Sequence, residues 1–341
     1  MTNEEKDDRE MDKKLIGIDI GGTSVKIGVL DIHGSIIQKW EITTRKENKG
    51  INILNDIWES INTKLTTDEI SNEIIGIGVG APGFVNQKTG IVFEAVNIGW
   101  KNFNLKEKLQ SISNLPVFVE NDANLATLGE NWIGAGNHSD DIIVITLGTG
   151  VGSGIIANGE LLNGTNGTAG EIGHIIVDPD GLPCNCGRIG CLDTIASAPG
   201  VVHKALEAIK NHPSSDLAKF YNSKGDITSE DIFNLAKKGS KLSQSIINDI
   251  TDTLGYTIAA VATVINPSKI LIGGGLSKSK NQLLNEVNKS FKKYTLPRVF
   301  EGCNLEIAEL GNDAGIIGAA YLVKKSINTL KHQTLESEKV K

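Results

Sequence analysis

One imidazole and three thiols lie close together in the sequence, with Gly187 and Gly190 able to bend the loop between them. The four side chains are His174, Cys184, Cys186 and Cys191. Three thiolates and one imidazole form a closed tetrahedral ligand set for Zn²⁺, and such closed sets are structural rather than catalytic. The alternative is a group of buried free thiols. We predict a structural zinc site here, and we expect the remaining cysteine, Cys303, to lie in the core.

Two glycine-rich turns follow runs of β-branched residues. The first turn offers Asp19, Gly21, Gly22 and Thr23, and the second offers Gly148, Thr149 and Gly150. Backbone amides in such turns can donate to phosphate oxygens, and threonine hydroxyls can add further donors. Neither turn has the Gly-Lys-Ser/Thr ending of a Walker loop, and ordinary hairpin turns are the alternative. Asp19 favours a phosphate site, because a carboxylate at a strand end can hold hydrated Mg²⁺ beside the phosphates.

A third polar group, Glu120-Asn121-Asp122, lies between a predicted strand and a predicted helix. A helix N-terminus stabilises negative charge, so we expect Asp122 to be ionised at neutral pH. Such an aspartate is either a helix cap or a base that accepts a proton from a substrate hydroxyl. The position alone favours the cap and leaves the base open.

The elements that position these residues come as two similar halves. Strand, glycine turn and strand follow one another over residues 15–30 and again over residues 143–156. Apolar spacing and capping signals predict further strands at 36–43, 74–79, 117–120, 269–275 and 304–310, and helices at 51–65, 104–109, 123–132, 242–265, 281–294 and 313–330, with another helix starting at 228–231. The pattern predicts two duplicated α/β units facing one cleft.

Composition narrows the class of protein. The chain has 341 residues and a net charge of −7, which disfavours a nucleic-acid surface. It has no apolar run near the roughly 18 residues of a membrane helix, and the acidic residues 1–14 do not form a signal peptide. Three clustered cysteines fit a cytoplasmic metal site better than a secreted disulfide framework. We therefore expect a cytoplasmic protein without a membrane or nucleic-acid partner.

Several motifs together resemble one family, the ROK sugar kinases (repressor, open reading frame, kinase), and within it the bacterial glucokinases. The resemblance covers residues 15–330 and rests on Asp19-x-Gly-Gly-Thr23, Glu120-Asn-Asp122, Leu147-Gly-Thr-Gly150, Glu171-Ile-Gly-His174, Cys184-x-Cys-Gly-x-x-Gly-Cys191 and Gly273-Gly-Gly275. It implies a two-domain actin-like (ribonuclease H-like) ATPase fold with a cleft between the domains. It also implies ATP-dependent phosphorylation of a hexose 6-hydroxyl, with glucose as the expected sugar.

The resemblance also implies a role for each motif residue. Asp122 is the expected general base, and the expected sugar ligands are Asn97, Asn121, Asp122, Glu171, His174 and Asp193. The two glycine turns bind the phosphates of ATP, with Mg²⁺ near Asp19, and the adenosine lies against Gly273, Gly274 and Gly275. Asp193 departs from the family, which usually has glutamate there. Since aspartate is one methylene shorter, this departure bears on the identity of the sugar and not on the class of reaction.

The same resemblance gives the domain boundaries and the alternatives. A tail at 1–14 precedes a small domain at 15–121 plus 312–330, a large domain at 122–311 carries the zinc loop, and a polar tail follows at 331–341. A homodimer is expected. An N-acetylmannosamine or other hexosamine kinase is the closest alternative, and polyphosphate remains open as donor. A sugar-binding repressor is disfavoured, because only 14 residues, with a net negative charge, precede the first strand, too few for a helix-turn-helix.

Overall fold

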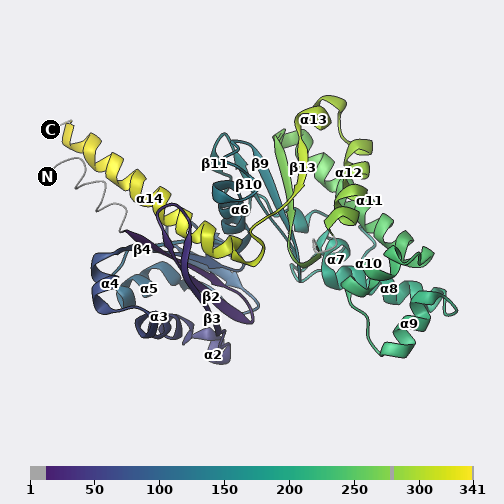
Figure 1. The fold of residues 1–341 in the computed structure, drawn as a ribbon, viewed down its shortest axis with the longest axis horizontal. Coiled ribbons are helices and arrows are strands. Elements are labelled where there is room, and N and C mark those ends of the chain that lie inside the picture. Colours follow the sequence, from purple (N-terminus) through teal and green to yellow (C-terminus); the bar gives the residue numbers. More distant parts are fainter. Residues whose placement is uncertain (1–12, 277–279, 340–341) are drawn as a thin grey trace. The chain divides into compact units, whose positions relative to one another are not determined.

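The computed structural model describes residues 13–276 and 280–339, which form two compact units (Figure 1). The first unit comprises the described residues up to His138, the segment Asn163–Ala169, and the chain from Asn312 onward. The second comprises Ser139–Leu162 and Gly170–Gly311. No helix among the described residues is long and apolar enough to cross a membrane.

The first unit is built on a five-stranded sheet of order β3-β2-β1-β4-β8. Its strands are β1 (Lys14–Ile20), β2 (Ser24–Asp31), β3 (Ile36–Thr43), β4 (Ile74–Ala81) and β8 (Val117–Asn121). The first three pair antiparallel, whereas β4 runs parallel to both β1 and β8. Asp19 is therefore level with Gly80, and Asn121 with Ala81, at the carboxyl ends of the parallel strands.

The second unit repeats this arrangement in a sheet of order β11-β10-β9-β12-β13. Its strands are β9 (Ile142–Leu147), β10 (Val151–Ala157), β11 (Glu160–Leu161), β12 (Lys269–Gly273) and β13 (Asn304–Ile307). Again three strands pair antiparallel and the next two join in parallel. The two sheets share one topology, so the repeat predicted from the two glycine turns is confirmed.

The helices of the first unit are α2 (Glu47–Gly50), α3 (Ile53–Lys64), α4 (Thr67–Asn72), α5 (Leu105–Ser113), α6 (Asp122–Ile133) and α14 (Ala314–Lys339). Helix α14 packs on α6 and on strands β1 and β4. The predicted boundary at residue 122 separates α6 from the first unit, whereas its packing on α14 groups it with that unit. Helix α14 also continues past the predicted end at Leu330 to Lys339.

Small residues allow α14 to approach the sheet closely. A Cβ atom on Gly17 would lie 2.0 Å from the Ile316 carbonyl oxygen, and one on Gly78 would lie 1.9 Å from the Ala319 carbonyl oxygen. Both distances are far below van der Waals contact, so the two glycines set the separation between α14 and strands β1 and β4. The two strand glycines thus allow α14 to pack tightly on the sheet.

Replacing Gly78 by alanine is expected to destabilise the first unit. The added methyl group meets backbone on α14, which cannot move aside as a flexible side chain could, and overpacking typically costs about 1–3 kcal/mol or more. Urea unfolding of Gly78→Ala should show the loss. Gly302→Ala is the matched control, because nothing lies within 4 Å of a Cβ there. Equal stability of the two variants would contradict this account of the packing.

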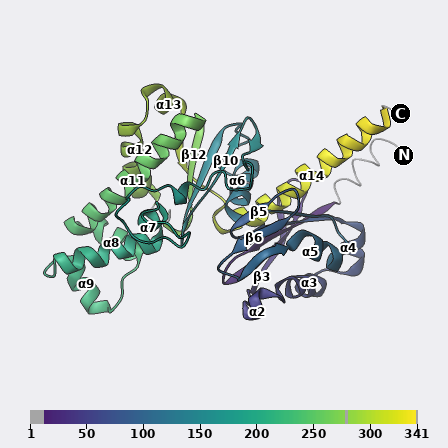
Figure 2. The same cartoon turned by 180° about the vertical axis from the view of Figure 1, so that it is seen from behind.

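The helices of the second unit are η1 (Ile172–His174), α7 (Asp193–Ala196), α8 (Ala198–Asn211), α9 (Asp216–Lys224), α10 (Ser229–Lys237), α11 (Lys241–Ile265), α12 (Lys280–Tyr294) and α13 (Pro297–Gly302), and η3 (Gly311–Asp313) leads back to the first unit (Figure 2). The long helix α11 packs on α8, α10 and α12.

The first unit also contains a three-stranded sheet that was not predicted. Its strands, β5 (Phe84–Asn86), β6 (Ile91–Ala95) and β7 (Trp100–Asn104), are too short to show alternation.

Candidate active site

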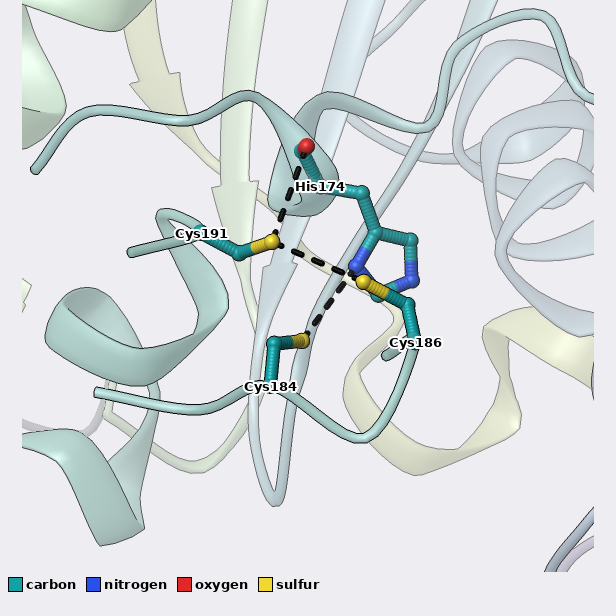
Figure 3. Close-up of side chains that lie close together, drawn as sticks. All are labelled: His174, Cys184, Cys186 and Cys191. Carbon is teal, nitrogen blue, oxygen red and sulfur yellow. Dashed lines mark hydrogen bonds between the residues drawn. The ribbon is translucent and has the colours of Figure 1, made fainter. Parts of the chain in front are cut away.

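The predicted zinc ligands come together in the second unit (Figure 3). One ligand atom from each of His174, Cys184, Cys186 and Cys191 lies within 4.8 Å of the other three. The Sγ atom of Cys184 is 3.7 Å from Nδ1 of His174, and the Sγ atoms of Cys186 and Cys191 are 3.6 Å apart. The fourth cysteine, Cys303, is buried away from this group, as predicted.

These spacings fit a tetrahedral zinc site. Zn–S bonds of about 2.3 Å and Zn–N bonds of about 2.05 Å place neighbouring ligand atoms about 3.6–3.8 Å apart. A disulfide would need sulfur atoms about 2.05 Å apart, so the 3.6 Å separation of Cys186 and Cys191 excludes one. The donor set and its spacing therefore match a closed metal site and not a cross-link.

Turns in the cysteine loop bring the thiols together. The backbone N–H of Cys184 donates to the Arg188 carbonyl (2.7 Å), and the N–H of Gly187 donates to the Cys184 carbonyl (2.9 Å). Gly190 adopts a φ of 75°, and a Cβ atom there would lie 1.5 Å from the Asp178 carbonyl oxygen. Only glycine fits position 190, because it permits both the left-handed conformation and the close backbone approach.

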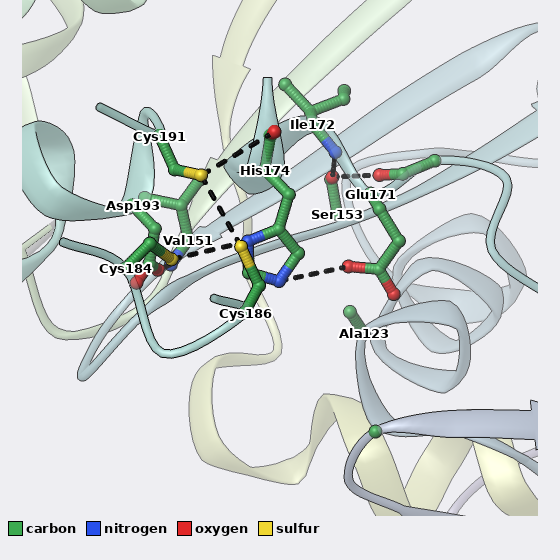
Figure 4. A network of polar contacts seen from close by, with 12 residues as sticks. Ala123, Val151, Ser153, Glu171, Ile172, His174, Cys184, Cys186, Cys191 and Asp193 are labelled. Carbon is green, nitrogen blue, oxygen red and sulfur yellow. Dashed lines mark hydrogen bonds and ion pairs between the residues drawn. The ribbon is translucent and has the colours of Figure 1, made fainter. Parts of the chain in front are cut away.

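The second ring nitrogen of His174 faces Glu171. Nε2 lies 3.9 Å from Oε2 of Glu171, while Nδ1 faces the thiol of Cys184 (Figure 4). Burial raises the pKa of Glu171, and the nearby His174 partly offsets that effect. The two side chains keep partial exposure, 32% for Glu171 and 26% for His174. The imidazole thus joins the thiol cluster to a half-buried carboxylate that is still accessible to a small ligand.

Strand β10 holds the segment that carries these two residues. The hydroxyl of Ser153 donates to the Gly170 carbonyl and accepts the N–H of Ile172 (3.2 Å) (Figure 4). Gly173 packs so closely on β10 that a Cβ atom would lie 2.1 Å from the Val151 carbonyl oxygen. Sequence reasoning missed Ser153, since a serine inside a glycine-rich strand gives no separate signal.

The second glycine turn connects β9 to β10. The N–H of Gly148 donates to the Gly150 carbonyl (2.9 Å) and closes the turn. Gly274, which follows β12, has a φ of 87°, and a Cβ atom there would lie 2.4 Å from the Leu147 carbonyl oxygen. The predicted nucleotide residues 148–150 and 273–275 therefore lie at the ends of adjacent strands, β9 and β12, within one sheet.

The first glycine turn connects β1 to β2 in the other unit. The N–H of Gly21 donates to the Ser24 carbonyl (2.9 Å), and the hydroxyl of Thr44 donates to the Gly21 carbonyl (2.8 Å). Asp19 precedes the turn, 3.9 Å from the Lys26 ammonium. Burial raises the pKa of Asp19, and the charge of Lys26 partly offsets that effect. A bound cation would favour the ionised form of this partly buried carboxylate.

Asn121 caps helix α6, and Asp122 is its first residue. The side-chain oxygen of Asn121 accepts the N–H groups of Ala123 (2.9 Å) and Asn124 (3.1 Å), and its amide donates to the Gly83 carbonyl (3.0 Å). The carboxylate of Asp122 accepts the N–H of Ala123 (2.9 Å). The cap that sequence reasoning favoured for Asp122 is therefore made by its neighbour, and the cap interpretation of Asp122 is wrong.

A buried carboxylate, that of Glu120, lies next to Asn121 and Asp122, and sequence reasoning gave it no role of its own. Glu120 is 1% exposed and accepts the N–H of Asn121 (2.8 Å) and the amide of Asn124 (3.1 Å). Burial raises the pKa of Glu120, against the lowering effect of these hydrogen bonds. Asn124 also donates to Asn163 (3.3 Å), whose own amide donates to Gln87 (2.8 Å). Helix periodicity in the sequence cannot reveal such a network, because its members lie far apart along the chain.

Asn97 lies beside the first glycine turn. It is exposed, and its Cβ atom would be 3.5 Å from a Cβ atom on Gly22. The first unit thus carries Asp19, Gly21, Gly22, Thr23, Asn97, Asn121 and Asp122, and the second carries Gly148, Thr149, Gly150, Glu171, His174, Asp193, Gly273, Gly274, Gly275 and the thiol cluster.

Two mixed five-stranded sheets of one topology, each with a glycine turn between two antiparallel strands, match the actin-like ATPase fold of solved ROK sugar kinases. The chain belongs to the ROK family, whose sequence model matches residues 15–326.

The glucokinase of Halalkalibacterium halodurans is 47% identical over 322 residues, which is 94% of this chain and 98% of the relative. A ROK family glucokinase from Streptomyces griseus, solved with glucose and AMPPNP, is 34% identical with a TM-score of 0.76, over 92% of this chain and 99% of that one. The ROK hexokinase of Thermus thermophilus is 26% identical with a TM-score of 0.78, over 93% and 99%.

Proposed function

We propose that this protein is an ATP-dependent glucokinase that transfers the γ-phosphoryl group of ATP to the 6-hydroxyl of glucose. The observation that carries the proposal is the 47% identity to a bacterial glucokinase over 94% of the chain, together with the place of Asp122 as the first residue of α6, beside the capping residue Asn121. A sugar kinase needs one carboxylate near the attacking hydroxyl, and phosphoryl transfer depends more on positioning than on a strong base.

Asp122 accepts the proton of the sugar 6-hydroxyl as that oxygen attacks the γ-phosphorus. Its place at the start of α6 favours a negative charge, because the N-terminal amides of a helix stabilise anions. The side chain of Asn121 makes three hydrogen bonds that fix the backbone around Asp122. Glu120 in turn accepts the N–H of Asn121. A rigid carboxylate of this kind loses little entropy when substrate binds.

The remaining sugar hydroxyls are held by Glu171 and His174, with Asn97 and the second amide hydrogen of Asn121 as further contacts. The carboxylate of Glu171 accepts from hydroxyl groups, and Nε2 of His174 faces the same region. When bound, Zn²⁺ on the thiol cluster has a structural role: it fixes the orientation of the His174 ring. Sites built around hydroxyl hydrogen bonds discriminate strongly between sugars.

ATP is held by backbone amides of the two glycine turns, and the adenosine lies against the turn at Gly273, Gly274 and Gly275. Asp19 is the residue that would hold Mg²⁺. Protein Mg²⁺ sites typically combine one or two carboxylates with substrate phosphates, and Asp19 supplies a single partly buried carboxylate beside such a turn. Mg²⁺ there would neutralise charge on the phosphates. A cytoplasmic location and a homodimer complete the proposal.

A panel of sugars tests the function. With ATP, we expect glucose to give the largest kcat/KM for ADP release, and N-acetylmannosamine, mannose and N-acetylglucosamine to give values lower by at least tenfold. The measurement is a coupled ADP assay, with glucose 6-phosphate identified by mass spectrometry. A larger kcat/KM for a hexosamine would assign the protein to that alternative. Absence of ADP above background with every sugar would contradict the kinase itself.

A further inference from the structure

Asp193 contacts the second glycine turn directly. Its Oδ1 atom accepts the N–H of Val151 at 2.6 Å, from the first residue of helix α7 (Figure 4). The same oxygen occupies the space beside Gly150, where a Cβ atom would lie 2.9 Å from it. A side chain at position 150 would therefore displace the carboxylate, so the glycine and the aspartate depend on one another.

The start of α8, which follows α7 directly, holds the opposite end of the turn. The N–H of Ala198 donates to the Gly148 carbonyl at 2.9 Å. The turn 148–150 is thus bound from both sides by one short segment, through Asp193 at its exit and through Ala198 at its entry. Its own closing hydrogen bond joins Gly148 to Gly150. A turn fixed at three points keeps its free amides in one orientation.

The segment that bears Asp193 is itself tied to the cysteine loop. The N–H of Leu192 donates to the Ile175 carbonyl (2.9 Å), and the hydroxyl of Thr194 donates to the Cys191 carbonyl (2.8 Å). The carbonyl of Val151 packs against Gly173 on the opposite side. The peptide groups of Val151 therefore contact both arms of the loop, the one leading to His174 and the one leaving Cys191.

We infer that Asp193 is a positioning residue for the nucleotide: its carboxylate fixes the turn 148–150 by holding the Val151 amide, so that the turn amides are oriented for the phosphates of a nucleoside triphosphate. This rests on the proposed function. It differs from the sugar-ligand role that the family resemblance gives to this position. The distance of 2.6 Å to Val151 shows one carboxylate oxygen already engaged in the protein.

Chain length makes the inference specific to aspartate. Glutamate is longer by one methylene, which moves its carboxylate by about 1.5 Å, too far to keep the same bond to Val151. Asparagine keeps one acceptor oxygen at the same distance, while the charge is lost and the other oxygen is replaced by an amide group that donates. Alanine removes the acceptor and leaves the Val151 amide without its partner, at a cost that is typical of a broken hydrogen bond to a buried group.

Isothermal calorimetry of the full-length protein tests the inference with two probes, Mg-AMPPNP and glucose, titrated separately. We expect Asp193→Ala to weaken AMPPNP binding by about tenfold, with glucose affinity within about twofold of wild type. Asp193→Asn should stay within about threefold for both probes. Asp193→Glu should weaken AMPPNP more than glucose.

Weaker glucose binding with unchanged AMPPNP binding in Asp193→Ala or Asp193→Glu would overturn the inference and return Asp193 to the sugar. An Asp193→Asn variant as weak for AMPPNP as Asp193→Ala would overturn the role of the acceptor oxygen. Thermal melts of each variant show whether it is folded, and Asp193→Glu, which should weaken AMPPNP more than glucose, keeps the test valid if the alanine variant unfolds. A wild type that binds AMPPNP but does not phosphorylate glucose would overturn the proposed function alone.

Discussion

Asp122→Asn should lower kcat for glucose phosphorylation by about 10² or more and leave the glucose affinity within a few fold. The amide keeps the shape of the carboxylate and can still accept the Ala123 N–H, so the start of α6 should remain intact. It cannot accept the proton of the attacking hydroxyl, and general base catalysis typically contributes about 10²–10⁴ in rate. Steady-state kinetics and calorimetry with glucose measure the two quantities.

Asp216→Asn is the matched control for this variant. Asp216 is also the first residue of a helix, α9, follows a capping residue, Ser215, and accepts the next N–H in the same way, at 2.9 Å. The control should keep wild-type kcat. If both variants lose activity equally, the effect comes from helix starts and not from chemistry. If Asp122→Asn keeps near-normal turnover, Asp122 has only a local structural role.

Removal of one thiol from the cluster is expected to have the second large effect. Cys186→Ala leaves three ligands, and elemental analysis should find less than a fifth of the zinc of the wild type. The ligand-bearing loop then loses its brace, so we expect Tm to fall by about 10 °C and glucose affinity to fall at least tenfold. We expect glucose binding to depend on the metal, because His174 is a predicted ligand of the cluster and also faces Glu171.

Cys303→Ala controls for the loss of a thiol. Cys303 is buried like Cys184 and Cys191, but it lies outside the cluster. This variant should retain zinc and glucose affinity. Wild-type protein that contains no zinc as isolated would contradict the metal assignment. Equal Tm losses in the two variants would contradict the proposal that the metal stabilises the ligand-bearing loop.

Much of this architecture could be predicted because its signals are local. Each glycine turn follows a β-branched run, and their repetition predicted the shared topology of the two sheets. The zinc ligands were predictable because three of the four lie within eight positions and share one chemistry.

The features that could not be predicted depend on the path of the backbone, on contacts between distant residues, or on strands too short to give a pattern. Asn121 and Asp122 are both good capping residues, and only the path of the backbone decides that Asn121 takes the cap. The bond from Val151 to Asp193 joins residues 42 positions apart, and no spacing rule in the sequence points to it. The sheet β5–β7 was missed because its strands are three to five residues long and turns interrupt their alternation.

A crystal structure of the protein with glucose and AMPPNP tests the central claim most directly. The account predicts that a carboxylate oxygen of Asp122 lies about 2.6–3.2 Å from the 6-hydroxyl of glucose, with that hydroxyl facing the γ-phosphate. A bound glucose whose 6-hydroxyl lies beyond hydrogen-bond reach of Asp122, or contacts a different carboxylate, would contradict it.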